Sequence, residues 1–428
     1  MNYSQTLDFL FSQLPMYQRI GKAAYKADLS ATISLLDYLD NPQRHFKAVH
    51  IAGTNGKGSV AHMLASVLQT AGYKTALYTS PHLKDFRERI KIDGKVIPEE
   101  YVICFVEKHK AFFEKEQLSF FEMTVGLAFS YFAEQKPDIA IIETGMGGRL
   151  DSTNLINSLI SIITNIGYDH TAFLGNSLAE IAAEKAGIIK EKQNVIIGQK
   201  HLETSSVFIN KAVEKQAKIL FAEDFYQCKK IAESFSSAEY CIKELKSNKE
   251  SCLEIDLLGD YQEKNLQTAL LAIRQLKEVG LPISKESLNK GLKNIKEYTN
   301  FMGRWQILQK KPLVICDTAH NKEGLSVVLS QLKKMNAARI HFVLGFVNDK
   351  VIEDLLSLFP KDGIYYFCKA DIPRAMKTDE LELMSEKFAL KGKSYSSVQQ
   401  AYQAAIKNAK ENEIVFAGGS TFVVAEVL

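Results

Sequence analysis

A glycine-rich segment between a strand-like run and a helix-like run contains the residue types that point most directly to chemistry. The segment consists of Gly53, Thr54, Asn55, Gly56, Lys57, Gly58 and Ser59. Glycines let the backbone approach phosphate oxygens, and the N–H groups and positive dipole at the start of a helix face the anion. Lys57 would neutralise charge on the β- and γ-phosphates, and Ser59 would contact a phosphate or its Mg²⁺. The segment therefore predicts a phosphate-binding loop.

The spelling of this loop differs from the usual phosphate-loop motif, GxxxxGK[ST]. Only two residues separate Gly53 from Gly56, and Gly58 stands between Lys57 and Ser59. The alternative interpretation is a glycine-rich turn with an incidental lysine. The phosphate loop is favoured because the segment lies between a strand and a helix, where such loops occur.

Glu143 and His170 each end a strand candidate, and we expect them at the sheet edge that carries the phosphate loop. A carboxylate suits Mg²⁺, which takes few protein ligands besides phosphates and water. The alternative for Glu143 is a carboxylate that caps a helix or pairs with a cation. Histidine is an unusual magnesium ligand, so its residue type alone favours an ordinary histidine at a strand end.

The elements that must position these residues alternate between strands and helices. The first half contains strand candidates at 46–52, 74–79, 138–143 and 159–164, with helix candidates at 60–71 and 123–134. Such repetition indicates an α/β fold with a parallel sheet, covered on both faces, whose loops at the carboxyl ends of the strands bind ligands.

The rest of the chain indicates a second domain. Residues 200–255 are rich in lysine and glutamate and weakly patterned, and we expect them at the periphery of the first domain, followed by a helix at 263–279. The alternation then starts afresh, with strand candidates at 313–316, 340–344, 364–367 and 414–417. We therefore predict a larger domain at 1–298 and a smaller α/β domain at 299–428.

Composition indicates an ordinary globular protein of 428 residues, with 46% hydrophobic and 24% charged residues. The net charge of +3 gives no support to a nucleic-acid or membrane partner. The six cysteines are scattered without a CxxC pair, which favours reduced thiols. Neither a secretory signal nor an apolar run of membrane-spanning length is visible, so we expect a cytoplasmic protein.

The loop sequence Ile51-Ala52-Gly53-Thr54-Asn55-Gly56-Lys57-Gly58-Ser59 resembles the Mur ligase superfamily and, more narrowly, the folylpolyglutamate synthase/dihydrofolate synthase family. Three later segments match in the family's order: residues 78–83 (YTSPHL), 143–154 (ETGMGGRLDSTN), and 169–171 (DHT) through 184–188 (EKAGI). The resemblance implies a P-loop-type parallel-sheet ATPase domain followed by a smaller Rossmann-like α/β domain, with ATP bound between them. It also implies an enzyme that phosphorylates a pteroate or folate carboxylate with ATP. The amino group of L-glutamate then displaces the phosphate to form an amide.

The resemblance assigns roles to residues of the first domain. It implies that Ser80, Glu143 and His170 hold magnesium, which reverses the interpretation of His170 drawn from residue type alone. Lys57, His170 and Lys185 become catalytic candidates in the first domain. Several members of the superfamily carry a carboxylated lysine at the place of Lys185, so this residue is a candidate for that modification; the alternative is a solvated lysine.

Four residues match positions that contact ATP in the family: Asn265, Arg304, Asp317 and His320. Arg304 is also a catalytic candidate because its guanidinium suits the charge of a phosphate in transfer. Asp317 would accept ribose hydroxyls, and His320 would pack on adenine. The sequence departs from the family's pattern at three places, where Tyr261 replaces a common histidine, Trp305 follows the arginine and Thr318 replaces a small residue.

For the pterin substrate, the resemblance implies a pocket lined by Phe120, Phe121, Glu122, Leu150, Asp151 and Ser152. Aromatic rings suit a flat heterocycle, although the two phenylalanines could equally be core residues. Residues 25–29 (YKADL) loosely resemble a further pocket segment, but the Gly-Leu-x-Arg that often follows it is absent. Arg87 and Arg89 would attract an anionic glutamate tail, or belong to a solvated loop.

The predicted function is therefore an ATP- and Mg²⁺-dependent amide ligase that adds L-glutamate to dihydropteroate, to folates or to both, and that we expect to act as a monomer. Three alternatives stay open at this point. One is another superfamily ligase acting on cell-wall precursors or another amino-acid polymer. The second is a regulatory or transport protein that hydrolyses nucleotide to switch shape, and the third is a folate-binding relic without catalysis.

Overall fold

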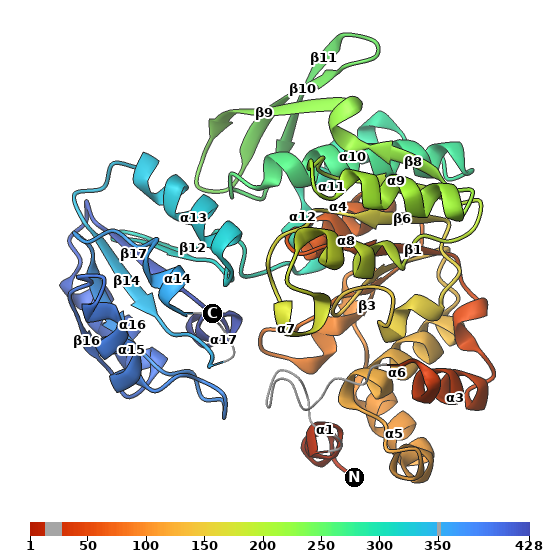
Figure 1. The fold of residues 1–428 in the computed structure, drawn as a ribbon, viewed down its shortest axis with the longest axis horizontal. Helices are drawn as coiled ribbons and strands as arrows, with labels where there is room; N and C mark the ends of the chain where they lie inside the picture. The colour runs from red at the N-terminus through yellow and green to blue at the C-terminus, as the bar shows by residue number, and fades with distance from the viewer. Residues whose placement is uncertain (13–27, 349–351) are drawn as a thin grey trace. The chain divides into compact units, whose positions relative to one another are not determined.

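The computed structural model describes residues 1–12, 28–348 and 352–428 (Figure 1). They form two compact units. The first contains Met1–Glu233, Ser237–Asp256 and Gln262–Phe301, and the second contains Ser234–Ser236, Leu257–Tyr261 and Met302–Leu428. The predicted domain limits, 1–298 and 299–428, stay a prediction.

An eight-stranded sheet forms the centre of the first unit. In spatial order its strands are β4 (Lys95–Val96), β3 (Ile90–Ile92), β2 (Thr75–Tyr78), β5 (Ile139–Glu143), β1 (Ala48–Ala52), β6 (Ile160–Ile163), β7 (Asn194–Ile197) and β8 (Lys218–Phe221). The six strands from β2 to β8 are parallel, and β3 and β4 are antiparallel additions at one edge. Parallel strands end at the same sheet edge, so the segments that follow β2, β5, β1 and β6 all begin there.

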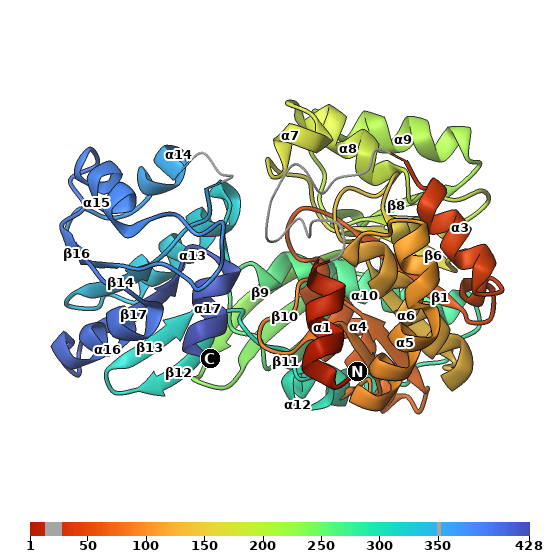
Figure 2. The ribbon, with the colours of Figure 1, turned by 90° about the horizontal axis from the view of Figure 1, so that it is seen from below.

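Helices cover both faces of this sheet (Figures 1 and 2). The helices of the first unit are α1 (Tyr3–Ser12), α3 (Ser30–Tyr38), α4 (Lys57–Thr70), α5 (Glu99–Lys115), α6 (Phe120–Gln135), α7 (Thr171–Leu174), α8 (Leu178–Ala186), α9 (Ser205–Glu214), α10 (Gln262–Glu278), α11 (Lys285–Lys293) and α12 (Ile295–Thr299). Short 3₁₀ turns occur at Pro42–Arg44, Phe86–Arg89, Ser152–Leu155 and Ala222–Asp224.

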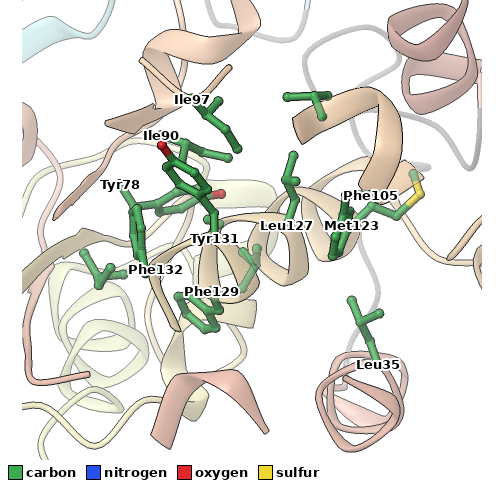
Figure 3. Packing of buried hydrophobic residues seen from close by; sticks show 14 of the residues in the cluster. Leu35, Tyr78, Ile90, Ile97, Phe105, Met123, Leu127, Phe129, Tyr131 and Phe132 are labelled. Carbon is green, nitrogen blue, oxygen red and sulfur yellow. The ribbon is translucent and has the colours of Figure 1, made fainter. Parts of the chain in front are cut away.

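One hydrophobic core packs α1, α3, α5 and α6 against the sheet, and Figure 3 shows part of it around α6. Ala140 and Ile142 of β5 belong to this core. Side chains alternate along a strand, so Ile139 and Ile141, which are also fully buried, point to the opposite face, where α4 contacts β5. Burial of both faces explains the nearly continuous apolar sequence of the parallel strands.

A three-stranded antiparallel sheet occupies part of the region that the sequence predicts as periphery. It consists of β9 (Tyr226–Glu233), β10 (Ala238–Glu244) and β11 (Lys249–Ile255), in the order β11-β10-β9. Tyr240 and Ile242 of β10 and Leu253 of β11 are buried, whereas the residues between them are largely exposed. One face of this sheet therefore packs on the first unit, through contacts with α10 and α11.

The second unit contains a six-stranded sheet of the same general type. Its strands, in spatial order, are β12 (Gln306–Lys310), β13 (Leu313–Cys316), β17 (Ile414–Gly418), β14 (Ile340–Leu344), β15 (Ile364–Phe367) and β16 (Gly392–Ser394). All are parallel except β12, which pairs antiparallel with β13. Its helices are α13 (Lys322–Lys334), α14 (Ile352–Leu356), α15 (Thr378–Glu386), α16 (Val398–Asn408) and α17 (Thr421–Val427).

Both units thus have the predicted α/β architecture, with a mostly parallel sheet in the first unit and a smaller, mostly parallel sheet in the second. The two-domain α/β fold predicted from the sequence is confirmed. Among the described residues, no helix combines the length and the apolar composition that crossing a membrane requires.

Candidate active site

The phosphate loop leaves β1 and enters α4 through two glycines in the left-handed region of backbone space. Gly53 has a φ of 149° and Gly56 a φ of 86°. A Cβ on Gly53 would lie 1.9 Å from Thr164 Oγ1, and one on Gly56 would lie 2.2 Å from Asn265 Oδ1. Only glycine fits positions that combine this conformation with such close neighbours. Helix α4 begins at Lys57, so the amide groups of its first turn belong to the loop.

The segment after β6 holds the loop in place. Asn165 accepts hydrogen bonds from the backbone N–H of Thr54 at its carbonyl oxygen (3.0 Å) and from that of Asn55 at Oδ1 (2.7 Å). Thr164 Oγ1 donates to the Asn55 carbonyl at 2.6 Å. The hydroxyl of Thr54 accepts from the N–H of Gly167 at 3.0 Å. Thr164 and Asn165 are not among the sequence-based candidates, although polar residues at the end of a buried strand are a signal that could have identified them.

Two lysines approach the start of the loop. Lys57 Nζ donates to the carbonyl oxygens of Gly53 (3.1 Å) and Thr54 (3.3 Å), and Lys185 Nζ donates to that of Gly53 at 2.9 Å. Lys185 lies on α8 and is buried, so the alternative of a solvated lysine is wrong. Burial, and then the positive charge of Lys57, lower the pKa of Lys185 to about 7, while Asp169 and Asp151 oppose this shift.

The three residues predicted to hold magnesium lie at or after the carboxyl ends of strands of the sheet. Glu143 is the last residue of β5, is buried, and lies beside the first turn of α4, with Oε2 3.7 Å from where a Cβ on Gly58 would be. The N–H of Ser80, two residues after β2, donates to Glu143 Oε2 at 3.4 Å. His170 precedes α7, in the segment that holds the phosphate loop. Among the described residues, no three histidine, cysteine, aspartate or glutamate side chains gather to hold a metal ion.

The start of helix α10 packs against the phosphate loop. Asn265 is buried beside Gly56, and its Nδ2 donates to Gln262 Oε1 at 2.8 Å. Gln262 Nε2 in turn donates to the hydroxyl of Ser59 at 3.2 Å. The structure therefore brings Asn265 to the loop, whereas Ser59 is buried and bonded to a side chain.

In the second unit, the predicted nucleotide residue Asp317 is buried and already hydrogen-bonded. Its Oδ2 accepts from the hydroxyl of Tyr261 (2.5 Å) and the N–H of Trp305 (2.7 Å), and its Oδ1 accepts from the N–H of Ala319 (2.7 Å). Burial raises the pKa of Asp317, and the charge of Arg304 opposes that rise. Two of the three departures from the family pattern, Tyr261 and Trp305, thus serve as partners of this carboxylate.

The third departure, Thr318, lies next to Asp317. Its N–H donates to the carbonyl of Gly303 at 3.0 Å, which ties the residue to the turn that carries Arg304. Its hydroxyl is buried and has no hydrogen-bond partner among the described residues. His320 Nδ1 lies 2.9 Å from the Thr318 carbonyl oxygen, and Arg304 and His320 are both partly exposed.

The residues predicted to line a pterin pocket divide into packed and accessible ones. Phe120 is buried in the hydrophobic core and contacts the ring of Phe86. Phe121 is partly buried, and its ring fills the space where a side chain on Gly145 would lie, 2.5 Å from the position of a Cβ. Glu122 forms a capping box with Ser119 at the start of α6. Phe121 therefore lies against the loop that follows β5.

Asp151 anchors the loop that follows β5. Its carboxylate accepts hydrogen bonds from the N–H groups of Gly145 (2.8 Å), Met146 (2.9 Å) and Thr153 (3.0 Å). Burial raises the pKa of Asp151, and these bonds oppose the rise. Ser152 is buried and accepts from the hydroxyl of Thr32 at 3.0 Å, whereas Leu150 is partly exposed. The structure therefore gives Asp151 a role in shaping the loop.

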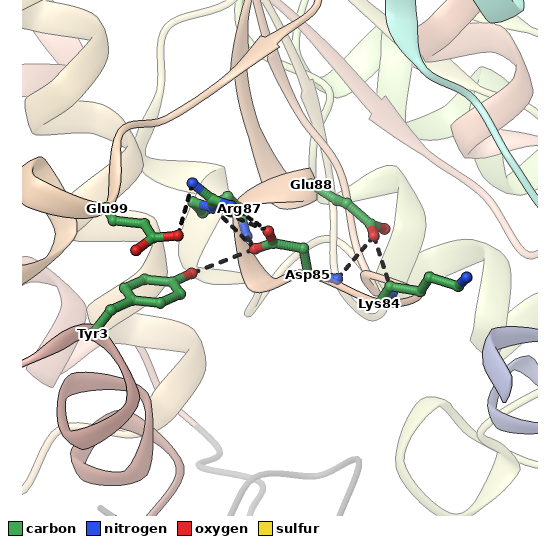
Figure 4. A network of polar contacts seen from close by, with 6 residues as sticks. All are labelled: Tyr3, Lys84, Asp85, Arg87, Glu88 and Glu99. Carbon is green, nitrogen blue, oxygen red and sulfur yellow. Dashed lines mark hydrogen bonds and ion pairs between the residues drawn. The ribbon is translucent and has the colours of Figure 1, made fainter. Parts of the chain in front are cut away.

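A polar network joins the loop after β2 to Tyr3 of α1 and Glu99 of α5, as Figure 4 shows. Arg87 Nη2 pairs with Asp85 at 2.7 Å, and Nη1 pairs with Glu99 at 3.2 Å. Burial would raise the pKa of Asp85, but its hydrogen bonds with Arg87 hold it below the ordinary value. Tyr3 donates its hydroxyl to Asp85 at 3.4 Å. Arg87 is therefore engaged with two carboxylates of the protein.

Arg89 differs from Arg87 because it is fully buried, so its interpretation as part of a solvated loop is wrong. Its Nε donates to His82 Nδ1 at 2.7 Å, and its guanidinium lies over the Phe120 ring. Burial lowers the pKa of Arg89. Nearby groups, Glu143 among them, oppose this shift because they stabilise the cationic guanidinium. Of the weakly matching segment at 25–29, residues 25–27 lie outside the described residues.

Comparison with protein families matches both units of the chain. A family described as the Mur ligase middle domain matches residues 51–273, and one described as the Mur ligase, glutamate ligase domain matches residues 303–421. The first match includes the phosphate loop, Glu143 and Lys185. The second includes Arg304 and Asp317.

Individual proteins match the chain over nearly its whole length. It is 30% identical to the folylpolyglutamate synthase of Lacticaseibacillus casei, over 98% of this chain and 96% of that protein. It is 32% identical to the dihydrofolate synthase/folylpolyglutamate synthase of Bacillus subtilis, over 95% of each. Its fold matches the structure of E. coli FolC in complex with DHPP and ADP with a TM-score of 0.84 and 28% identity, over 100% of this chain and 97% of that one.

Proposed function

Because the chain belongs to the Mur ligase family, in its folylpolyglutamate synthase/dihydrofolate synthase branch, we propose that it joins L-glutamate to dihydropteroate, to folates or to both. As a member of this family it is an ATP-dependent ligase. The observation that carries the proposal is the full-length match to enzymes named for this reaction, together with a phosphate loop on which two lysines converge.

In the proposed mechanism, the residues of the phosphate loop bind the phosphates of ATP. The N–H groups at the start of α4 point at the anion, and Lys57 exchanges its two loop carbonyls for phosphate oxygens. Arg304, partly exposed on the second unit, would add positive charge as the γ-phosphate moves to the substrate carboxylate. The resulting acyl phosphate gives the glutamate amine a good leaving group to displace.

The residues after β2 and β5 fit a magnesium ion by the chemistry of their oxygens. Glu143 offers a buried carboxylate beside the first turn of α4, and Ser80, with its hydroxyl, lies next to it. We propose that these two, with His170, hold the ion. A bound magnesium ion would supply charge neutralisation on the phosphate oxygens. Among the described residues, the hydroxyl of Thr144 next to Glu143 is buried without a hydrogen-bond partner, which fits a polar ligand nearby.

We further propose that Lys185 is carboxylated. A neutral amine attacks CO₂, and a pKa of about 7 makes a substantial fraction of Lys185 neutral near physiological pH. The carbamate would turn a buried cation beside Lys57 into an anion, which removes the repulsion between the two groups. It could then orient Lys57 or a metal ion at the phosphate loop.

The acceptor side of the reaction depends on positioning, so no side-chain nucleophile is required. Phe121, partly exposed beside the loop after β5, is the best-placed residue of the predicted pterin set for stacking on a flat ring. Asp151 would act indirectly, by holding that loop.

We also propose that the protein is a cytoplasmic monomer. Cell fractionation would test the location, and gel filtration at the mass of one chain would test the oligomeric state.

The decisive experiment measures phosphate release from ATP with Mg²⁺, L-glutamate and either dihydropteroate or tetrahydrofolate, with the amide product identified by mass spectrometry. We expect release that requires both L-glutamate and a pterin. The pterin that supports release distinguishes between the two activities. Release that is indifferent to both would overturn the proposal. A Lys57→Gln variant, which removes the proposed phosphate contact, controls for contaminating ATPases.

A further inference from the structure

Cys241 and Cys252 lie directly opposite each other in the antiparallel pair of β10 and β11. Residues opposite each other in such a pair have side chains on the same face. Here that face is the outer one, because Tyr240, Ile242 and Leu253, the neighbours along the two strands, are buried on the other. Cys252 is exposed and Cys241 partly exposed, and both are free thiols. Ten residues lie between them in the sequence, so the register of the hairpin is what brings them together.

The backbone geometry of this pair suits a disulfide. Opposite residues in an antiparallel ladder have Cα atoms about 4.5 or about 5.5 Å apart, according to their place in the hydrogen-bonding pattern. Disulfides span Cα separations of about 4.4 to 6.8 Å. A disulfide is therefore compatible with both Cα separations, that of a hydrogen-bonded pair and that of a non-hydrogen-bonded pair. Closing the bond therefore requires little movement of the backbone, and the buried face of the sheet keeps its contacts with α10 and α11.

The other four cysteines provide a contrast. Cys228, Cys316 and Cys368 are buried, and burial raises the pKa of each thiol, which disfavours the reactive thiolate. Cys104 is exposed on α5, far along the chain from any other cysteine and outside the three-stranded sheet. Cys228 lies on β9 opposite Ile242, on the buried face, and so faces away from the outer pair.

We propose that Cys241 and Cys252 form a surface dithiol that low-molecular-weight disulfides convert into an intramolecular disulfide. The thiolate of Cys252, the more exposed residue, attacks one sulfur of the small disulfide, forms a mixed disulfide and releases one small thiolate. The thiolate of Cys241 then attacks Cys252 Sγ, forms the Cys241–Cys252 bond and releases the second small thiolate. Two protein thiols are oxidised, one small disulfide is reduced to two thiols, and the protons pass to solvent or to the released thiolates.

The second step should be much faster than further reaction with the small disulfide. Cys241 is held opposite the mixed disulfide by the hairpin, so its attack is intramolecular and its effective concentration is high. A single exposed cysteine lacks this neighbour and stops at the mixed disulfide. The inference is independent of the proposed ligase activity, because the thiol face lies on β10 and β11 and includes none of the residues proposed to bind substrates.

The experiment treats the full-length native protein with oxidised glutathione, alkylates the remaining thiols and maps the peptides by mass spectrometry without reduction. We expect a cross-linked peptide that joins Cys241 to Cys252, with the loss of two hydrogens, and glutathione attached to Cys104. The thiols accessible to alkylation in the native protein should fall from three, Cys104, Cys241 and Cys252, to none, and a dithiol reductant should restore all three.

Three variants keep the result interpretable. Cys241→Ser and Cys252→Ser should each leave the remaining cysteine of the pair carrying glutathione, because the intramolecular second step is lost. Cys104→Ser, the matched control, should form the cross-link as the natural sequence does. The proposal is overturned if glutathione accumulates on both Cys241 and Cys252 of the natural sequence, if the pair does not react, or if the disulfide joins two chains.

Discussion

Lys57 and Lys185 donate hydrogen bonds to the same backbone oxygen, the carbonyl of Gly53, at 3.1 and 2.9 Å. Two ammonium groups on one acceptor repel each other, and the repulsion is strongest where water is excluded. Lys185 is buried and Lys57 only partly so, and it is the pKa of Lys185 that falls to about 7. Lys185 therefore loses its proton far more readily than an ordinary lysine.

Replacing Lys57 by glutamine should reduce catalysis far more than stability. Among the described residues, the Nζ of Lys57 donates only to two loop carbonyls, and one of them also accepts from Lys185, so we expect the free energy of unfolding to change by about 0.5 kcal/mol or less. Loss of a charge on the transferring phosphate should lower kcat about 10²- to 10³-fold. Steady-state phosphate release measures the effect, with Lys47→Gln at an exposed lysine as the control. Equal losses in both variants would contradict the assigned role.

Carbon-13-labelled bicarbonate should reveal carboxylation of Lys185 as a carbamate signal in the NMR spectrum of the protein. With a pKa of about 7, the neutral amine increases as pH rises through 7, so the signal should grow between pH 6 and 8. An ordinary lysine, with a pKa of about 10.4, would give almost none in this range. Lys185→Arg should abolish the signal. In Lys57→Gln the pH dependence should shift upward, because the neighbouring charge is gone.

A carbamate signal that persists in Lys185→Arg would place the modification on another lysine. Activity offers an independent measurement. Removal of CO₂ should lower phosphate release by the natural sequence, and bicarbonate should restore it. If phosphate release does not depend on CO₂ and no carbamate signal forms, Lys185 is not carboxylated and acts as an amine.

The central strands of the two larger sheets could be predicted closely from the sequence, because buried parallel strands are short apolar runs bounded by polar residues. Strands nearer the sheet edges were not predicted: β3, β4, β7, β8, β12 and β16. The predictions at 313–316, 340–344 and 364–367 coincide with β13, β14 and β15. The predicted start of α4, at residue 60, is three residues later than the observed start at Lys57. Gly56 and Gly58 are poor helix formers, so the sequence of the first turn resembles that of a loop. A glycine at Gly56 is nevertheless needed there, because it lets the backbone pass close to Asn265.

The strands β9, β10 and β11 and their pairing were harder to predict because the lysine and glutamate of their outer face are poor strand formers, and Cys241 and Cys252 interrupt the apolar–polar alternation. Within the candidate site, residues adjacent to strand ends, such as Glu143, could be found from the sequence. The partners of Asp317 could not, because Tyr261 is 56 residues away in the chain and the Trp305 contact is made by its backbone. No local pattern encodes such long-range hydrogen bonds.

Replacing Tyr261 by phenylalanine should destabilise the protein by about 1 to 3 kcal/mol, because the buried carboxylate of Asp317 loses a donor 2.5 Å away. The pKa of Asp317, already raised by burial, should rise further. Tyr261→His introduces the residue common in the family and keeps a ring N–H donor, so we expect it to retain more stability than the phenylalanine variant. Urea unfolding of the full chain measures the difference. Identical midpoints for both variants would show that this hydrogen bond contributes little.

Gly187 should tolerate no larger side chain, for steric reasons alone. Its φ of −60° suits any residue, but a Cβ would lie 2.4 Å from Cα and Cβ of Arg149, at the end of the loop after β5. We expect Gly187→Ala to lower the free energy of unfolding by about 1 to 3 kcal/mol. Activity should also fall, because the loop anchored by Asp151 would move.

Gly280 provides the matched control for that substitution. It has a φ of 92°, and nothing lies within 4 Å of the position that a Cβ would take, so Gly280→Ala introduces backbone strain without a clash. It should cost about 1 kcal/mol and leave activity per folded molecule unchanged. If the two variants behave alike in activity, the contact between Gly187 and Arg149 does not position the loop.

Acid should destabilise the protein partly through His50, a buried residue of the central strand β1. Burial, and then the charge of Lys190, lower the pKa of His50 to about 3. Its Nε2 lies 2.9 Å from Thr153 Oγ1, and among the described residues its Nδ1 has no hydrogen-bond partner, so the charged ring would bury an unpaired N–H. An unfolded histidine binds its proton at a pH of about 6.5.

Between those two pKa values, unfolding takes up a proton at His50, so the free energy of unfolding falls as pH falls. The slope from this residue is at most about 1.4 kcal/mol per pH unit, which amounts to about 2 kcal/mol by pH 5. His50→Gln keeps a polar group near Thr153 and removes the titration, so its stability should fall less steeply between pH 7 and 5. Comparing slopes cancels both the packing cost of the substitution and the contribution of other histidines. Equal slopes would mean that His50 is protonated in the folded protein, with Thr153 and the strand adjusting to its charge.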